Sequence, residues 1–135
     1  MTMDSFGTEL PPTPTAPSLV RGWLRATLHT WNLDGFGHVT ELLSTELVAN
    51  VVDHVREPMS VRIFRHPTFI RVEVDDPSSE TPTLHRPSAN DDRHRGMFIV
   101  ESFSNRWGTI GHRDDGKTVW FEIDATRARE EMHSE

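Results

Sequence analysis

The sequence predicts an α+β domain, a two-layer α/β sandwich in which helices cover one face of a mixed, mostly antiparallel sheet. The order of its hydrophobic patterns is the first observation: two helices, a β-hairpin, a long polar loop, a helix and a second hairpin. Its length is the second, because 135 residues with 35% hydrophobic side chains suit one domain with a single core. Amphipathic helices and a half-apolar sheet bury their apolar surfaces against each other, which gives two layers.

The N-terminal third of the chain predicts two helices after a proline-rich arm. Residues 1–17 are expected to form a flexible arm, since "PPTPTAPS" cannot continue a regular element, although "SFGTEL" before it favours a marginal strand. Ser18 is a suitable N-cap for a helix over residues 19–31. A second helix is expected over residues 38–56, and it ends before Pro58 because the residue that precedes a proline disfavours the helical conformation.

Two hairpins and a third helix complete the expected domain. Alternating apolar residues in "SVRIFRHPTFIRVEVDD" predict two strands joined by a turn at "RHPTF". Residues 77–95 are polar and rich in proline, which predicts a long loop, and a helix is expected to start near Gly96. The stretch "WGTIGHRDDGKTVWFEID" predicts the closing hairpin, with its turn at "DDG". The folded domain is therefore expected over residues 18–124, followed by a charged tail over residues 125–135.

The composition argues against several classes of function. The formal net charge of −7 disfavours direct binding of nucleic acid, which needs a basic surface. The chain has no cysteine, which excludes disulfides and thiolate metal sites, and its eight histidines match no familiar ligand spacing. No apolar run has the length of a membrane span and no secretory leader is visible, so a cytoplasmic domain without membrane contact is expected.

A polar stripe on the second predicted helix is the first candidate site. Four residues recur at steps of four, three and four positions, opposite the apolar side of the helix: Glu46, Asn50, Asp53 and Glu57. Taken alone, such a stripe is the usual solvated face of an amphipathic helix. Two interpretations therefore stay open at this point, a helix face that only meets water and one that holds a ligand.

Three separated stretches carry a resemblance to a known family. They are "ELLSTELVANVVDHV", "IRVEVDDPSSETP" and "HRGMFIVESFSNRWG", the last followed by "GKTVWFEI". In this order they resemble the N-box, the strand motif after it, and the glycine box with its closing strands in the GHKL, or histidine-kinase-like, ATPases. The resemblance is closest to the anti-sigma-factor serine/threonine kinase branch of that superfamily. It covers about residues 18–124 and implies the histidine-kinase-like ATPase fold.

The resemblance assigns roles to four residues of the first two motifs. Asn50 would give an amide oxygen to Mg²⁺, a hard cation that takes one or two protein oxygens. Glu46, one helical turn earlier, would accept the proton of an attacking hydroxyl as a general base. His54 would approach phosphate or ribose. Asp76, at the end of a predicted strand, would accept a hydrogen bond from the adenine amino group and so select ATP.

Later residues would complete the nucleotide site. Ser78 stands where many relatives have glycine. Arg95, Gly96 and Met97 would open a helix whose N-terminal amides point at the phosphates, because a helix N-terminus binds anions. Thr118, in the closing hairpin, would add a hydroxyl contact.

The activity of the family implies an anti-sigma regulatory factor, a homodimer that uses ATP and Mg²⁺. It would sequester a sigma factor and phosphorylate a serine or threonine of an anti-sigma antagonist protein, with the loop over residues 77–95 as a lid. The chain departs from the pattern at His94, where relatives have glycine, and at Asp91 and Asp92, where further glycines are expected. These departures motivate the alternative of a non-catalytic module of the same fold that sequesters a partner with weak or no ATP binding.

Overall fold

A computed structural model describes residues 4–78, 92–113 and 116–126, with the backbone alone described over residues 92–95. Its helices and strands follow one another as β1 (Asp4–Leu10), α1 (Ala16–Thr30), α2 (Gly37–Asn50), β2 (Met59–Arg65), β3 (Phe69–Asp76), α3 (Asp92–Phe103), β4 (Arg106–His112) and β5 (Gly116–Asp124). Two short turns flank α2, the 3₁₀ turn η1 (Asp34–Phe36) and the π-helical turn η2 (Val51–Val55). This order of elements agrees with the sequence prediction.

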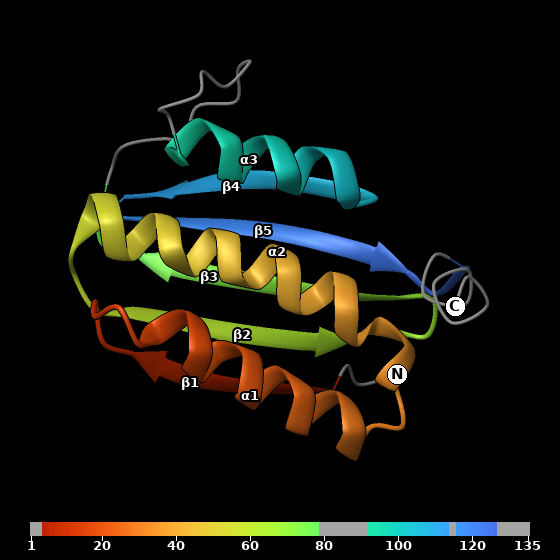
Figure 1. Cartoon of the computed structure of the whole chain (residues 1–135). Helices are drawn as coiled ribbons and strands as arrows, with labels where there is room; N and C mark the ends of the chain where they lie inside the picture. Colours follow the sequence, from red (N-terminus) through yellow and green to blue (C-terminus); the bar gives the residue numbers. More distant parts are fainter. Residues whose placement is uncertain (1–3, 79–91, 114–115, 127–135) are drawn as a thin grey trace.

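The five strands form one sheet in the order β1-β2-β3-β5-β4. The three α-helices lie over one face of this sheet (Figure 1). The expected α+β class with two layers is therefore confirmed. Every strand pair is antiparallel, so the described sheet is fully antiparallel and not mixed. The chain crosses from β3 through α3 to β4, which runs in the same direction as β3, but β5 lies between these two strands and pairs antiparallel with both.

The N-terminal region is more ordered than its prolines predict. Residues 4–10 fall in the predicted arm, but the marginal strand favoured by "SFGTEL" is confirmed: they form β1 and pair with β2 along its whole length, from Asp4 opposite Arg65 to Leu10 opposite Met59. Leu10 is buried, so this strand contributes to the core. An edge strand of this kind is stabilised by the side chains opposite it on the neighbouring strand. Those partners are distant in the sequence, so local sequence patterns indicate the strand only weakly.

The first helix begins earlier than predicted. α1 starts at Ala16, and Pro17 lies in its first turn, where the fixed φ of proline suits a helix and its missing N–H would have no partner. Ser18 is consequently inside the helix and is not its N-cap. The Ser18 hydroxyl instead accepts a hydrogen bond from Arg21 Nη2 at 3.2 Å.

The second helix changes its winding where the sequence predicts one continuous α-helix. α2 ends at Asn50, and the next five residues form the π-helical turn. The Arg56 N–H donates to the Val51 carbonyl, five residues earlier, at 2.8 Å. Arg56 then adopts a left-handed backbone conformation with φ of 61°, which ends the helix. Single π-helical turns are frequent at functional sites, and this one places Asn50 at the junction of two helix types.

The core fills the space between the helices and the inward face of the sheet. The first predicted hairpin is confirmed, since alternate residues of its two strands are buried: Val61 and Ile63 on β2, and Ile70, Val72 and Val74 on β3. The inward face of β5 continues this layer with Val119, Phe121 and Ile123. The helices cover it with apolar side chains that include Leu24, Leu28, Leu43 and Val48.

The third helix also starts earlier than predicted, at Asp92 and not near Gly96. Gly96 therefore lies in its second turn, and the free N–H groups of the helix belong to the residues before it. The closing hairpin is confirmed by the antiparallel pairing of β4 with β5. Residues 79–91 of the predicted loop, residues 114–115 of the predicted "DDG" turn and residues 127–135 of the tail lie outside the described residues.

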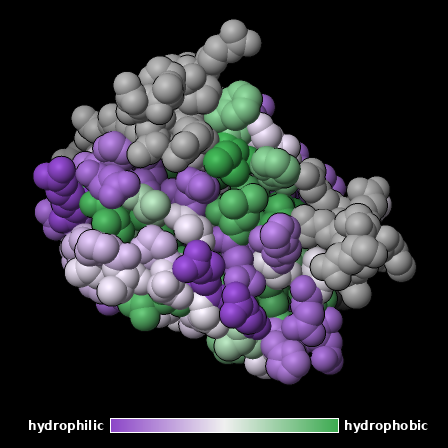
Figure 2. Space-filling model, in the orientation of Figure 1, coloured by the Kyte–Doolittle hydropathy of each residue, from purple (hydrophilic) through white to green (hydrophobic). Residues whose placement is uncertain are grey.

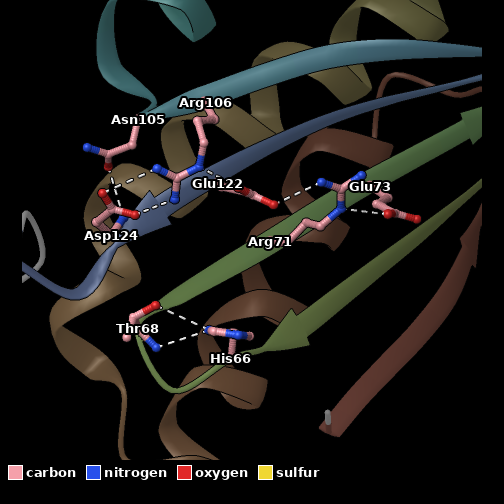
Figure 3. A network of polar contacts seen from close by, with 8 residues as sticks. All are labelled: His66, Thr68, Arg71, Glu73, Asn105, Arg106, Glu122 and Asp124. Atoms are coloured by element: carbon pink, nitrogen blue, oxygen red, sulfur yellow. Dashed lines mark hydrogen bonds and ion pairs between the residues drawn. The ribbon is translucent and has the colours of Figure 1, made fainter.

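The outward face of the sheet carries a ladder of ion pairs (Figure 3). Arg71 lies between Glu73 and Glu122, with N–O distances of 2.7 Å and 2.9 Å. Arg106 reaches the other oxygen of Glu122 at 2.6 Å. The Arg71 guanidinium also lies 4.0 Å from the centre of the Trp120 ring, a favourable cation–π geometry. The two sheet faces therefore differ in kind, one packed against helices and one covered by charge pairs.

Arg106 ties the edge strand β4 to β5 at the end of this ladder. Hydrogen bonds to Asp124 and to Glu122 raise the pKa of the Arg106 guanidinium above its ordinary value, so it stays charged wherever the protein is folded. The Asn105 side-chain oxygen accepts a hydrogen bond from the Asp124 N–H at 2.8 Å (Figure 3). These contacts fix the register of the closing hairpin.

The helix side of the molecule is mostly polar, but hydrophobic side chains gather over α3 (Figure 2). Phe98 and Phe103 expose 46% and 43% of their surface there. Among the described residues, no helix has the length and hydrophobicity needed to cross a membrane.

Candidate functional site

Four segments that are far apart in the sequence meet at one end of the molecule (Figure 1): the C-terminal end of α2, the last residue of β3, the first turns of α3 and the start of β5. Asp76 of β3 pairs with Lys117 of β5 in the sheet. Gly96 of α3 faces Glu46 of α2. The fold thus brings residues of all three sequence motifs to the same end.

Buried oxygen atoms without a partner identify two residues of this end. Six buried side-chain oxygens accept or donate no hydrogen bond within the described part of the chain: Thr40 Oγ1, Ser44 Oγ, Thr45 Oγ1, Asn50 Oδ1, Asp76 Oδ2 and Ser104 Oγ. Four are hydroxyls in or next to a helix, and a hydroxyl can rotate toward the carbonyl one turn earlier. Asn50 Oδ1 and Asp76 Oδ2 can only accept. Leaving such an acceptor unpaired costs about 1–3 kcal/mol, so both atoms call for a donor or a cation.

Asn50 suits a hard cation. Its amide oxygen is the type of ligand that Mg²⁺ takes from a protein, with phosphate and water oxygens filling the remaining positions. The residue stands at the end of α2, immediately before the π-helical turn, and its Oδ1 is buried without a partner among the described residues. The chemistry of this position therefore fits Mg²⁺.

Glu46 lies where α2 passes α3. A Cβ atom at Gly96 would come within 3.1 Å of Glu46 Oε2 and 3.8 Å of Glu46 Cβ. Glycine leaves this space to the glutamate side chain. Glu46 is half-buried and precedes Asn50 by one helical turn. A carboxylate in this position has the chemistry of a general base, one helical turn from the Asn50 amide.

Asp76 is held through one oxygen and presents the other. Its Oδ1 accepts hydrogen bonds from the Ser78 N–H at 2.8 Å and from Lys117 Nζ at 3.0 Å. The bond from Ser78 forms a local turn that fixes the orientation of the carboxylate. The side chains of Lys117 and Asp76 expose only 7% and 1% of their surface. Because Oδ1 is occupied, Oδ2 is the oxygen left for a ligand.

The sequence prediction did not include Lys117. It is the only lysine of the 135 residues, so the other 13 of the 14 basic residues are arginines. Strand alternation in "GKTVWFEID" contained the signal, because it places Lys117 on the same face as the buried residues Val119, Phe121 and Ile123. A cation on a core face requires a buried anion, and only the pairing of β3 with β5 shows that Asp76 is that anion.

A hollow of about 500 Å³ opens at this end of the sheet. It is lined by Pro58, Ser60, Arg62, Asp75, Asp76, Pro77, His112 and Lys117. Asp76 and Lys117 therefore border open space although little of their own surface is exposed. Glu46 and Asn50 do not line this hollow, so of the predicted site residues it includes only Asp76.

The side chains of two predicted site residues, Thr118 and Met97, have partners within the protein. Thr118 lies on the outward face of the sheet, where its hydroxyl donates to Asp75 and hydrogen-bonds with His112 Nε2 at 2.7 Å. Thr118 therefore does not share a sheet face with Asp76, because successive residues of a strand point to opposite faces, and its predicted hydroxyl contact with the nucleotide stays a prediction. The Met97 side chain is 1% exposed and belongs to the core, whereas the predicted phosphate contact concerned the backbone amides at the start of the helix.

The remaining predicted contacts are only partly described. His54 lies in the π-helical turn with its side chain exposed, and nothing in its contacts directs it toward Asn50. The side chains of Arg95, His94 and Asp92 lie outside the described residues, as does Asp91 altogether. Their predicted effects on phosphate binding stay predictions.

Comparison with known proteins gives no assignment: no protein-family model matches the sequence, and no curated protein matches it. The geometry around Asn50 and Asp76 carries the functional inference.

Proposed function

We propose that the protein is an ATP-binding regulator with the histidine-kinase-like ATPase fold, of the anti-sigma-factor serine/threonine kinase type. The observation that carries this proposal is the pair of buried acceptors without a partner, Asn50 Oδ1 and Asp76 Oδ2. Mg²⁺-ATP supplies what each lacks, a divalent cation for the amide oxygen and an exocyclic amino group for the carboxylate. The order of the three motifs and the helix-covered antiparallel sheet support the same assignment.

The base end of the site is built on Asp76. Its Oδ2 accepts a hydrogen bond from the adenine amino group, while Ser78 and Lys117 hold Oδ1 and keep the carboxylate in place. The phosphate end is built on Asn50 and the first turn of α3. Asn50 holds Mg²⁺, which when bound neutralises charge on the phosphates, and the free amides of the helix start face the anion.

Glu46 is the residue that we assign to proton transfer. In-line transfer to a serine or threonine of the antagonist protein needs an acceptor for the hydroxyl proton near the phosphate end. Glu46 meets this need because it lies one turn from Asn50 and against Gly96 of α3. In the complete proposal the protein acts as a homodimer that sequesters a sigma factor until the antagonist releases it.

Calorimetric titration with ATP, with and without Mg²⁺, tests the binding claim. The native protein is expected to bind ATP saturably and more tightly with Mg²⁺. Asn50→Ala should remove the gain from Mg²⁺, and Asp76→Asn should weaken binding by roughly tenfold, the effect of one lost hydrogen bond to a charged group. Asp124→Asn is the matched control, because Asp124 lies at the opposite end of β5 from Lys117 and should leave ATP binding unchanged. A native protein without ATP binding refutes the proposal.

Transfer of labelled phosphate from ATP to a candidate antagonist tests the catalytic claim. Glu46→Gln keeps the size of the side chain but removes the proton acceptor, and it is expected to slow transfer about 10²–10⁴-fold while ATP still binds. Transfer at the native rate in this variant would exclude Glu46 as the base.

One observation favours a second candidate function, a non-catalytic module that sequesters its partner without nucleotide. The Lys117 ammonium already lies on Asp76 and supplies a donor inside the protein. If this internal pair replaces the nucleotide base, titration with ATP gives no heat, and the protein binds its sigma factor equally well with and without ATP. A sigma complex that forms only with ATP excludes this candidate.

A further inference from the structure

Lys117 has more hydrogen-bonding capacity than its surroundings use. An ammonium carries three N–H donors. Within the described residues, Lys117 donates one hydrogen bond, to Asp76 Oδ1 at 3.0 Å. Lys117 is 6% exposed, so water satisfies little of the remainder. Buried charges are normally paired and fully hydrogen-bonded, which leaves this ammonium short of acceptors within the described residues.

The neighbouring carboxylate has the opposite shortage. Asp76 Oδ2 is buried and accepts no hydrogen bond within the described part of the protein. An unsatisfied donor and an unsatisfied acceptor therefore lie on adjacent side chains, and both residues are among those that line the hollow at the sheet end. A ligand that satisfies both must present an acceptor and a donor side by side.

Adenine has this arrangement on one edge, with the 6-amino group as donor and the ring nitrogen N1 as acceptor. Guanine reverses it, with an acceptor at position 6 and a donor at N1. With a carboxylate opposite position 6 and an ammonium opposite position 1, adenine makes two hydrogen bonds. Guanine instead places an oxygen against a carboxylate and an N–H against an ammonium.

The geometry points to Lys117 as a specificity-determining residue that donates a hydrogen bond to N1 of adenine while Asp76 accepts from the 6-amino group. This inference rests on the proposed function, since it concerns how the same site reads its nucleotide. The choice of residue type supports it. Arginine provides every other basic side chain, and its planar fork favours bidentate pairing with a carboxylate, whereas a compact ammonium can serve one carboxylate oxygen and a ring nitrogen together.

Binding of ATP and of 1-deaza-ATP, in which N1 is replaced by a C–H group, tests the inference in the native protein and in Lys117→Met. The native protein should bind 1-deaza-ATP at least tenfold more weakly than ATP, the loss expected for a hydrogen bond to a charged group. Lys117→Met should bind the two nucleotides equally. Equal affinities in the native protein, or the same loss in Lys117→Met, would overturn the role of Lys117 and leave ATP binding itself intact. Failure of the native protein to bind ATP would overturn both proposals.

A second measurement needs no variant. Because Lys117 is the only lysine, protein labelled with ¹⁵N-lysine has a single side-chain ammonium resonance. ATP is expected to shift this resonance and 1-deaza-ATP to leave it near its position in the free protein. Identical shifts with the two nucleotides would show that the ammonium does not meet N1.

Discussion

Removal of the Lys117 ammonium is the sharpest test of the electrostatics at the sheet end. Both side chains of the Lys117–Asp76 pair are almost fully buried, so solvent screens the pair little. Breaking a buried ion pair by removing one partner typically costs 3–5 kcal/mol, because the remaining charge stays desolvated. In Lys117→Met the Ser78 N–H still donates a hydrogen bond to Asp76 and stabilises its charge. We therefore expect a cost at the lower end of this range, a loss of about 3 kcal/mol in the free energy of unfolding.

Urea unfolding followed by tryptophan fluorescence measures this loss, since the chain has four tryptophans. The double variant Lys117→Met/Asp76→Leu removes both charges and should recover to within about 1 kcal/mol of the native protein. Arg25→Met is the control, because the Arg25–Glu41 pair has a short N–O distance of 2.6 Å but an exposed guanidinium, and it should leave the midpoint near native. A cost below about 1 kcal/mol for Lys117→Met, or a double variant no better than the single one, would refute the reasoning.

Two glycine pairs give further predictions. Gly22→Ala in α1, where nothing lies within 4 Å, should raise the free energy of unfolding by about 0.5–1 kcal/mol through helix propensity. Gly96→Ala should raise the free energy of unfolding by less than Gly22→Ala and should slow phosphotransfer, because its Cβ would contact the Glu46 carboxylate. An equal gain in stability with unchanged transfer would contradict this. Gly108→Ala should cost about 1–3 kcal/mol in urea unfolding, since its Cβ would lie 2.9 Å from the facing indole. Gly111→Ala, in the same strand with open space around it, should unfold like the native protein, and equal midpoints for these two variants would count against the packing argument.

Hydrophobic periodicity was sufficient for the class of fold. Alternation in the two hairpins and helical spacing between them are local properties of the chain, so they predicted the sequence of elements and the inward faces of β2 and β3. Local rules were insufficient where an element depends on distant partners. β1 forms because β2 offers it a complete edge, and α1 and α3 extend N-terminally beyond their predicted starts.

The sequence by itself determined which residue types were available for the site: an amide at Asn50, carboxylates at Glu46 and Asp76, and a glycine at Gly96. Only the tertiary structure decided which of them meet. Pairing of β3 with β5 placed the single lysine on Asp76 and turned Thr118 to the opposite face. The physical reason is that burial and strand register are set by segments far apart in the chain, and a buried charge acquires its partner only when those segments pack together.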